Sequence, residues 1–344
     1  MATMDIFDDS AFRTRELSDA IDHIPNQFGM IGEMGLFTPK SIRTPLFMLE
    51  ERNGVLQLLQ SSTRGTPLPG SRRGLRDLRA YRTLRFGQSR EVTADDIDGI
   101  RAFGTESELV QVMDEVSDRQ TDIRMNVDIT REYLRSGALR GVVSDADGTL
   151  ILDLFAEFGV TQTEIDFDFG AADAQIQNKA NEVRRAIELN LRGDVMTGVG
   201  ALCSPGFWDA LMANESFREA YKFQSGLTPL RDDLRNQGIF WQGIYWREYL
   251  GQADVPQEDG TTISRNFIES GDARFFPMGT RNTFRQYNAP ADYMDVINTP
   301  GQAFYSSMGR DPSGHNRFVS IEGQMNTVPI CLRPRVLVRG HSTT

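Results

Sequence analysis

The sequence of 344 residues predicts an α+β protein, and three features point to that class. Apolar side chains recur at three- and four-residue intervals over residues 105–136, which predicts one long amphipathic helix. Alternating apolar and polar residues, typical of strands, occupy residues 140–170 and 303–341. Between them, residues 171–300 alternate helical and strand patterns, as an α/β region does. At roughly 150 residues per domain, the length suggests about two domains or one composite domain.

Residues 1–44 are predicted to form an N-terminal arm rather than part of a core. A short amphipathic helix is expected from Ser10 to Ile24, where Pro25 ends it. The glycine-punctuated segment that follows has no hydrophobic period, which fits an extended chain laid over another surface. Chain termini are ordered only where other groups hold them.

A β-hairpin is predicted around Asn53-Gly54, because this dipeptide accepts the positive φ angles of a type I′ turn. Its strands are expected at about 46–51 and 55–61. Residues 62–90, here called the basic segment, then carry eight arginines and one aspartate, a net charge of +7. Since the whole chain sums to −11, the remainder carries −18. A Gly- and Pro-containing stretch of this kind cannot build its own core, so it is a functional loop, a disordered linker or an arm ordered by a partner.

The long helix follows a short helical piece at 93–104, opens with a capping box at 105–108 and is expected to end at Gly137. It would be roughly 45 Å long at 1.5 Å per residue. Its predicted buried face carries Leu109, Met113, Val116, Ile123, Val127 and Leu134. Its predicted outward face is acidic and carries Glu106, Asp114, Glu115, Asp118, Asp122 and Asp128. Such a face can pair with the basic segment of another copy, although a charged helix face is usually only solvated.

The remaining elements follow the same two periodicities. Strands are expected throughout 140–170, and a turn at residues 145–148 joins the first pair. A helix at about 173–192, a buried strand at 195–202 and a helix at 205–223 follow. Further strands are expected within 239–251 and 273–280, and two or three more after residue 303. Gly198 and Gly200 are expected to permit close packing, and Trp208, Trp241 and Trp246 to lie in a core or interface.

One motif could carry chemistry. It resembles the nucleophile loop of haloacid-dehalogenase phosphatases, which work with Mg²⁺, and it reads Asp145-Ala146-Asp147-Gly148-Thr149. Lys179 and Asp272 would have to complete that site. The alternative, a simple hairpin turn, is favoured because the nucleophile loop should follow a buried parallel strand near the start of its domain.

Composition excludes several other classes. The charge of −11 argues against a protein that coats nucleic acid. Only three histidines occur, none at metal-ligand spacing, and the two cysteines, Cys203 and Cys331, are too few for a disulfide framework. Neither a secretion signal nor an apolar run long enough for a membrane helix is present in the sequence. We therefore expect no cofactor, no metal, no membrane partner and no catalysis.

Taken in order, these parts resemble the major capsid protein E family of tailed bacteriophages, which has the HK97 fold. The resemblance covers nearly the whole chain, and agreement in order and spacing carries it. Its most specific stretches are TPLFMLEERNGVLQLL at 44–59, GIFWQGIYWREYLG at 238–251, ARFFPMGTRNTFRQYNAPADYMDVINT at 273–299 and VPICLRPRVLVRG at 328–340.

The resemblance implies a structural protein that self-assembles into hexamers and pentamers of an icosahedral head in the host cytoplasm and encloses double-stranded DNA without specific binding. It implies an N-arm at 1–44, an E-loop at 45–92, a discontinuous P-domain at 93–170 and 301–344 with the long helix as its spine, and an A-domain at 171–300. The implied partners are other copies of the chain, a portal, a scaffold or protease and a decoration protein.

Two expectations about assembly follow. Arginines of the basic segment are predicted to contact carboxylates of an adjacent subunit, the candidates being Arg72, Arg73, Arg76 and Arg79 with Asp114, Asp118 and Asp122. Some relatives of this fold lock their shells with Lys–Asn isopeptide bonds. The only lysines here are Lys40, Lys179 and Lys222, none in the basic segment, so noncovalent reinforcement is expected.

Overall fold

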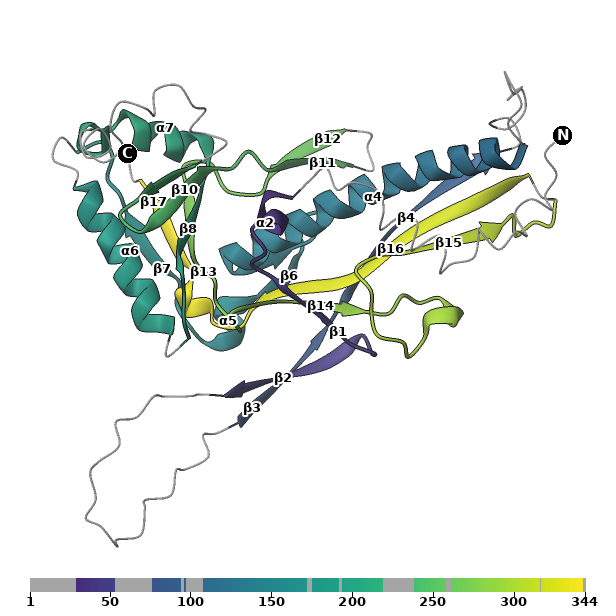
Figure 1. Ribbon diagram of the computed structural model, residues 1–344, viewed down its shortest axis with the longest axis horizontal. Helices are drawn as coiled ribbons and strands as arrows, with labels where there is room; N and C mark the ends of the chain where they lie inside the picture. Colours follow the sequence, from purple (N-terminus) through teal and green to yellow (C-terminus); the bar gives the residue numbers. More distant parts are fainter. Residues whose placement is uncertain are drawn as a thin grey trace, which may run out of the picture. The chain divides into compact units, whose positions relative to one another are not determined.

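The computed structural model mixes helices and strands (Figure 1). It describes residues 29–52, 76–93, 96, 108–171, 175–191, 194–218, 238–257, 261–315 and 317–342. The chain divides into two compact units, each drawn from three separate stretches. The first unit takes its described residues from Met1–Phe47, Arg82–Glu132 and Gln286–Pro329, and the second from Met48–Tyr81, Tyr133–Arg285 and Ile330–Thr344.

The first unit is organised around a five-stranded sheet in which β16 is the longest strand. The strand order is β1-β14-β16-β15, and β4 also pairs with β16. Its strands are β1 (Thr38–Ser41), β4 (Leu84–Thr93), β14 (Phe284–Ala289), β15 (Tyr305–Arg310) and β16 (Phe318–Cys331). Strands β15 and β16, with β17 (Val338–His341) of the second unit, follow residue 303. They confirm the prediction of two or three strands at the end of the chain.

Helix α4 (Glu108–Arg140) confirms the predicted long helix. The described apolar positions on its predicted inner face are buried, namely Val116, Ile123, Val127 and Leu134. The predicted end at Gly137 is wrong, because the helix continues for three more residues. A Cβ on Gly137 would lie 3.0 Å from the carbonyl oxygen of Val142 and 3.1 Å from Cα of Val143. Gly137 therefore permits a close approach of the following strand.

The second unit contains a six-stranded sheet in the order β7-β17-β13-β8-β10-β9. Within it, β10 runs parallel to β8 and β17 parallel to β7, whereas the pairs of β13 with β8 and β17 are antiparallel. The strands are β7 (Thr163–Asp166), β8 (Gly198–Cys203), β9 (Ile239–Trp241), β10 (Ile244–Glu248), β13 (Ala273–Met278) and β17 (Val338–His341). Helices α6 (Ile176–Leu191) and α7 (Pro205–Ala213) belong to the same unit.

Aromatic rings fill the core of the second unit. Phe167 stacks on Phe275, with ring centroids 5.7 Å apart, and Trp246 meets Phe275 edge-on at 5.2 Å. All three tryptophans are buried, which confirms that they anchor the core. Gly200 is also confirmed as a packing glycine, because a Cβ there would lie 2.6 Å from the Phe276 ring.

The region around the predicted hairpin confirms one strand and corrects another expectation. Strand β2 (Leu46–Arg52) matches the predicted first strand and pairs with β3 (Arg76–Arg82). The Asn53-Gly54 turn, the strand predicted at 55–61, the helix predicted at 10–24 and nearly all of the helical piece predicted at 93–104 lie outside the described residues. The C-terminal part of the basic segment is not a loop, because it forms β3 and β4. Strand β4 satisfies its backbone by pairing with β16 from Thr93 to Leu84.

Other predictions are wrong where tertiary contacts or helix capping override the local sequence pattern. The expected strand near residue 155 is helix α5 (Leu154–Phe158), because the Asp153 carboxylate accepts hydrogen bonds from the amides of Phe155 and Ala156. The helix predicted at 205–223 is interrupted at Asn214, which is extended: α7 ends at Ala213, and residues 215–218 are helical again. Five elements have no counterpart among the sequence predictions: α2 (Met30–Glu33), β1, β11 (Gln252–Pro256), β12 (Thr262–Asn266) and β14.

Candidate assembly surfaces and an ion-pair cluster

The arginines predicted to contact another subunit lie at and before β3. Arg72 and Arg73 are outside the described residues, and Arg76 is the first residue of β3. Arg79 is half-buried, and its guanidinium carbon lies 4.8 Å from the centroid of the Phe158 ring on α5. This cation–π contact ties β3 to α5 within one chain.

The carboxylates predicted as their partners lie on α4. Asp118 is exposed and Asp122 is half-buried, while the side chain of Asp114 is outside the described set. The predicted contacts join one subunit to the next, so the structure of a single chain leaves them as a prediction.

Asp128 does not belong to the outward acidic face of α4, and that prediction was wrong. Its carboxylate is buried between Arg124, whose Nε lies 2.9 Å away, and Arg131, whose Nη1 lies 2.8 Å away. These arginines stand at i−4 and i+3, the spacings that place side chains on one helix face. Arg131 also donates to the carbonyl oxygen of Ala303 at 3.0 Å.

The described part of the arm is anchored to α4 by a residue that the sequence analysis missed. The buried carboxylate of Glu132 accepts hydrogen bonds from the amides of Ile31 at 2.6 Å and Gly32 at 3.3 Å. Both amides lie in the first turn of α2, where a helix has unpaired donors and favours negative charge. The local sequence gives no signal of this role, because Glu132 is one of many charged residues along the helix.

The candidate phosphatase motif forms the turn between β5 (Val142–Ser144) and β6 (Leu150–Asp153), which pair antiparallel. The amide of Asp145 donates to the carbonyl of Thr149 at 2.9 Å, and Gly148 takes a φ of 94°. The amide and hydroxyl of Thr149 both donate to the Asp147 carboxylate and lower its pKa. This is the hairpin turn favoured by the sequence, and no parallel strand precedes it in the described residues.

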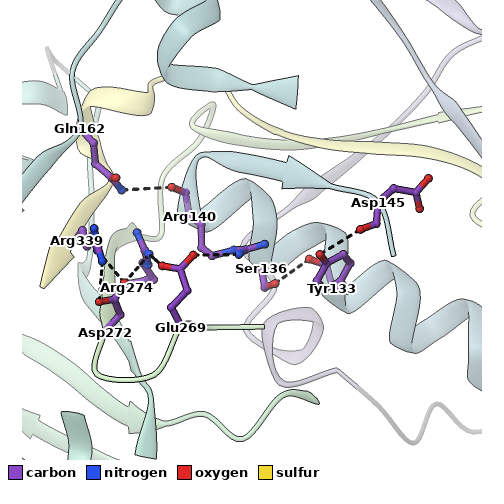
Figure 2. Close-up of polar contacts among 9 residues, drawn as sticks. All are labelled: Tyr133, Ser136, Arg140, Asp145, Gln162, Glu269, Asp272, Arg274 and Arg339. Atoms are coloured by element: carbon purple, nitrogen blue, oxygen red, sulfur yellow. Dashed lines mark hydrogen bonds and ion pairs between the residues drawn. The ribbon is translucent and has the colours of Figure 1, made fainter. Parts of the chain in front are cut away.

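Asp272 and Lys179, the proposed completions of a phosphatase site, are placed elsewhere. Lys179 lies on α6, whereas Asp272 belongs to an ion-pair cluster, and Figure 2 draws all of its members except Glu164. The cluster consists of three arginines and three carboxylates in the second unit, namely Arg140, Glu164, Glu269, Asp272, Arg274 and Arg339. Its formal charges therefore balance.

Asp272 is the centre of this cluster. Its Oδ2 lies 2.7 Å from Nη2 of Arg274 and 2.8 Å from Nε of Arg339, and Glu269 meets Arg274 at 2.6 Å. Burial lowers the pKa of Arg274, while the hydrogen bond that Arg339 donates to Asp272 raises the pKa of Arg339. Asp272 thus neutralises two arginines at the ends of β13 and β17, which is a structural role.

The described residues hold neither a candidate metal site nor a helix that could span a membrane. They contain no group of three or more His, Cys, Asp or Glu side chains placed to hold a metal ion. They also contain no helix that is both long enough and apolar enough to cross a membrane.

Two solved capsid structures share the fold of this chain. The putative capsid protein of an E. coli CFT073 prophage aligns with a TM-score of 0.54 and 12% identity, covering 96% of this chain and 99% of that chain. The capsid structure of cyanophage P-SCSP1u aligns with a TM-score of 0.51 and 10% identity, covering 93% and 90%. The protein therefore has an HK97-like capsid fold.

The family follows from the sequence match. The family described as Phage major capsid protein E matches residues 13–342, and the chain belongs to this family. It is 27% identical over 348 residues to the major capsid protein of Pseudomonas phage KPP10, covering 96% of both chains. It is 28% identical over 360 residues to the major capsid protein of Salmonella phage Felix O1, again covering 96% of both. The family resemblance in the sequence is thereby confirmed, and the protein is a structural capsid protein of a phage.

Proposed function

We propose that this chain assembles with itself into the hexamers and pentamers of an icosahedral head that encloses double-stranded DNA. The family match over residues 13–342, together with the HK97-like fold, carries the proposal. The net charge of −11 supports the proposal, because a negatively charged shell can enclose DNA without binding it tightly. Assembly would take place in the host cytoplasm, and the product would be the virion capsid.

The domain roles are part of this proposal. Residues 1–44 act as the N-arm, 45–92 as the E-loop, 93–170 and 301–344 as the P-domain, and 171–300 as the A-domain. The hydrogen bond from Arg131 of helix α4 to the carbonyl oxygen of Ala303 supports a P-domain built from distant stretches. Strand β4, at the end of the proposed E-loop, pairs with β16 of the P-domain. Strands β2 and β3 support a hairpin-like E-loop stem.

The proposed partners are further copies of the chain, a portal, a scaffold or protease and a decoration protein. Reinforcement of the shell would be noncovalent, because no lysine lies in the basic segment. Mature particles boiled in SDS should therefore run as single chains. A ladder of crosslinked chains would contradict this part of the proposal.

The test of the main proposal is to express the chain and image the purified product by negative-stain electron microscopy. Closed shells, or rings of six and five subunits, are the expected result. The competing phosphatase hypothesis instead predicts a small oligomer with Mg²⁺-dependent turnover that Asp145→Asn abolishes. Such an oligomer, without rings or shells, would overturn the capsid proposal.

A further inference from the structure

Residues 29–42, here called the strap, cross the first unit and contain α2 and β1. Figure 1 shows α2 beside α4, and the strap runs on from there to β1 at the edge of the five-stranded sheet. The strap is held at its start, on α4, and at its end, on the sheet. The two attachments differ in chemistry.

The start of the strap depends on one carboxylate and one apolar side chain. Both oxygens of Glu132 accept amides of α2, from Ile31 at 2.6 Å and from Gly32 at 3.3 Å. The Ile31 side chain is fully buried. Gly29, the N-cap of α2, supplies no side-chain cap, so Glu132 takes the place of one. Because a helix of four residues does not persist in water on its own, α2 depends on this attachment.

The end of the strap is held by backbone pairing and buried side chains. Leu36 and Phe37 are buried, and β1 pairs with β14. The amide of Ile42 donates to the carbonyl oxygen of Asn288 at 2.8 Å, and the carbonyl oxygen of Ile42 accepts from the amide of Gly301 at 2.9 Å. None of these contacts involves Glu132, so the end of the strap is secured independently of its start.

A glycine separates the two attachments. Gly35 is exposed and has a φ of 61°, in the left-handed region that side chains rarely adopt. Among the described residues, no atom lies within 4 Å of the position that a Cβ of Gly35 would take. The backbone can therefore rotate at this point without a steric clash.

We propose that the strap opens at its start, where α2 leaves α4 by rotation about Gly35 while residues 36–42 stay on the sheet. The Glu132 carboxylate keeps the strap closed. Opening redirects the arm without breaking the sheet, and it uncovers a site on α4 that binds the first turn of a helix through a carboxylate. The inference goes beyond the proposed function, because it concerns the single subunit and holds whether or not the chain assembles.

The experiment measures hydrogen exchange of single amides in unassembled subunits of the full chain, and the decisive variant is Glu132→Gln. The amides of Glu33 and Met34 report on α2, because they donate to carbonyl oxygens of their own turn and not to Glu132. The Ile42 amide reports on the end of the strap. In the variant, Glu33 and Met34 should exchange at least about tenfold faster, whereas Ile42 should stay within about twofold.

The matched control is Glu115→Gln, which removes the same charge from α4 at a position that pairs with Arg119. It should leave the three reporter amides within about twofold of the unmodified chain. A second variant, Ile31→Ala, keeps the carboxylate and removes most of the buried side chain beside it. It should also speed exchange at Glu33 and Met34, and it carries the test if Glu132→Gln does not fold.

Two results would overturn the inference. Unchanged exchange at Glu33 and Met34 in the folded variants would show that other contacts hold α2 in place. An increase at Ile42 as large as that at Met34 would show that the strap leaves as one piece or that the subunit unfolds as a whole. Neither result bears on the capsid proposal, which depends on the formation of rings and shells.

Discussion

At the scale of single residues, burial decides the chemistry of the two cysteines. Cys203 and Cys331 are free and fully buried. Burial, followed by the charge of Glu248, raises the pKa of the Cys203 thiol far above its usual range. Burial also raises the pKa of Cys331 to about 12, against a smaller lowering effect of Arg333.

Because the thiolate is the reactive form, we expect neither cysteine to react with a disulfide reagent in the native subunit at about pH 8. In urea the same reagent should modify both thiols of each chain, since unfolding restores their ordinary pKa values. Release of the coloured thiolate leaving group measures the reaction. Rapid modification before unfolding would show that one of the thiols is accessible.

Asp272 provides the test of the ion-pair cluster. Replacing it by Asn removes the buried charge that compensates Arg274 and Arg339, so the free energy of unfolding should fall by about 3 kcal/mol. Glu164→Gln is the matched control, because Glu164 meets the same Arg339 from an exposed position and should change stability by less than about 1 kcal/mol. Urea unfolding of unassembled subunits compares the two. Equal losses would contradict a central role for Asp272.

Some residue roles could be predicted from the sequence and others could not. Large aromatic side chains such as Trp246 were placed correctly in the core, because little else can bury them favourably. Asp128 was misplaced, since its charge suggested solvent while Arg124 and Arg131 compensate it inside. Glu132 was missed for a related reason: its partners are backbone amides of α2, which lie about a hundred residues away.

At the scale of an element, two glycines of β8 offer a controlled test of packing. Gly200→Ala should lower the free energy of unfolding by about 1–3 kcal/mol, because its Cβ would lie 2.6 Å from the Phe276 ring. Gly198→Ala, two residues earlier on the same strand, meets nothing nearer than 3.8 Å and should be neutral or slightly stabilising. Urea unfolding measures both. A loss at Gly198 as large as that at Gly200 would indicate a strand effect rather than a steric one.

Elements with a strong period were predicted well. The long α4 and the α6 helix have sustained apolar stripes, and β2 and β8 have clear strand composition. Strands that form only by pairing with a distant segment were predicted poorly. Strand β1 pairs with β14, and β4 pairs with β16, more than 200 residues away in sequence. The β11–β12 ribbon was missed because its alternation is short and its apolar face is small.

At the scale of the whole molecule, local patterns do not reveal that each unit is assembled from three stretches. Strand β8 pairs with β13 and β10, and β17 pairs with β7, so sheet order departs from chain order. The resemblance to a family implied one domain built from two stretches, 93–170 and 301–344, and that division stays a prediction. The intersubunit contacts of the basic segment remain a prediction at this scale.

We expect the double substitution Arg72→Glu and Arg73→Glu to lower particle yield by at least about tenfold while the unassembled subunit unfolds as before. Each exposed pair contributes only about 0–1 kcal/mol, so the effect arises because the same pair repeats at every interface of the shell. Lysine at both positions keeps the charge and should assemble in near-normal yield. Adding Asp118→Arg and Asp122→Arg to the glutamate variant should restore part of the yield if these carboxylates are the partners. Sedimentation and negative-stain imaging measure the yield, and normal assembly of the glutamate variant would rule the contact out.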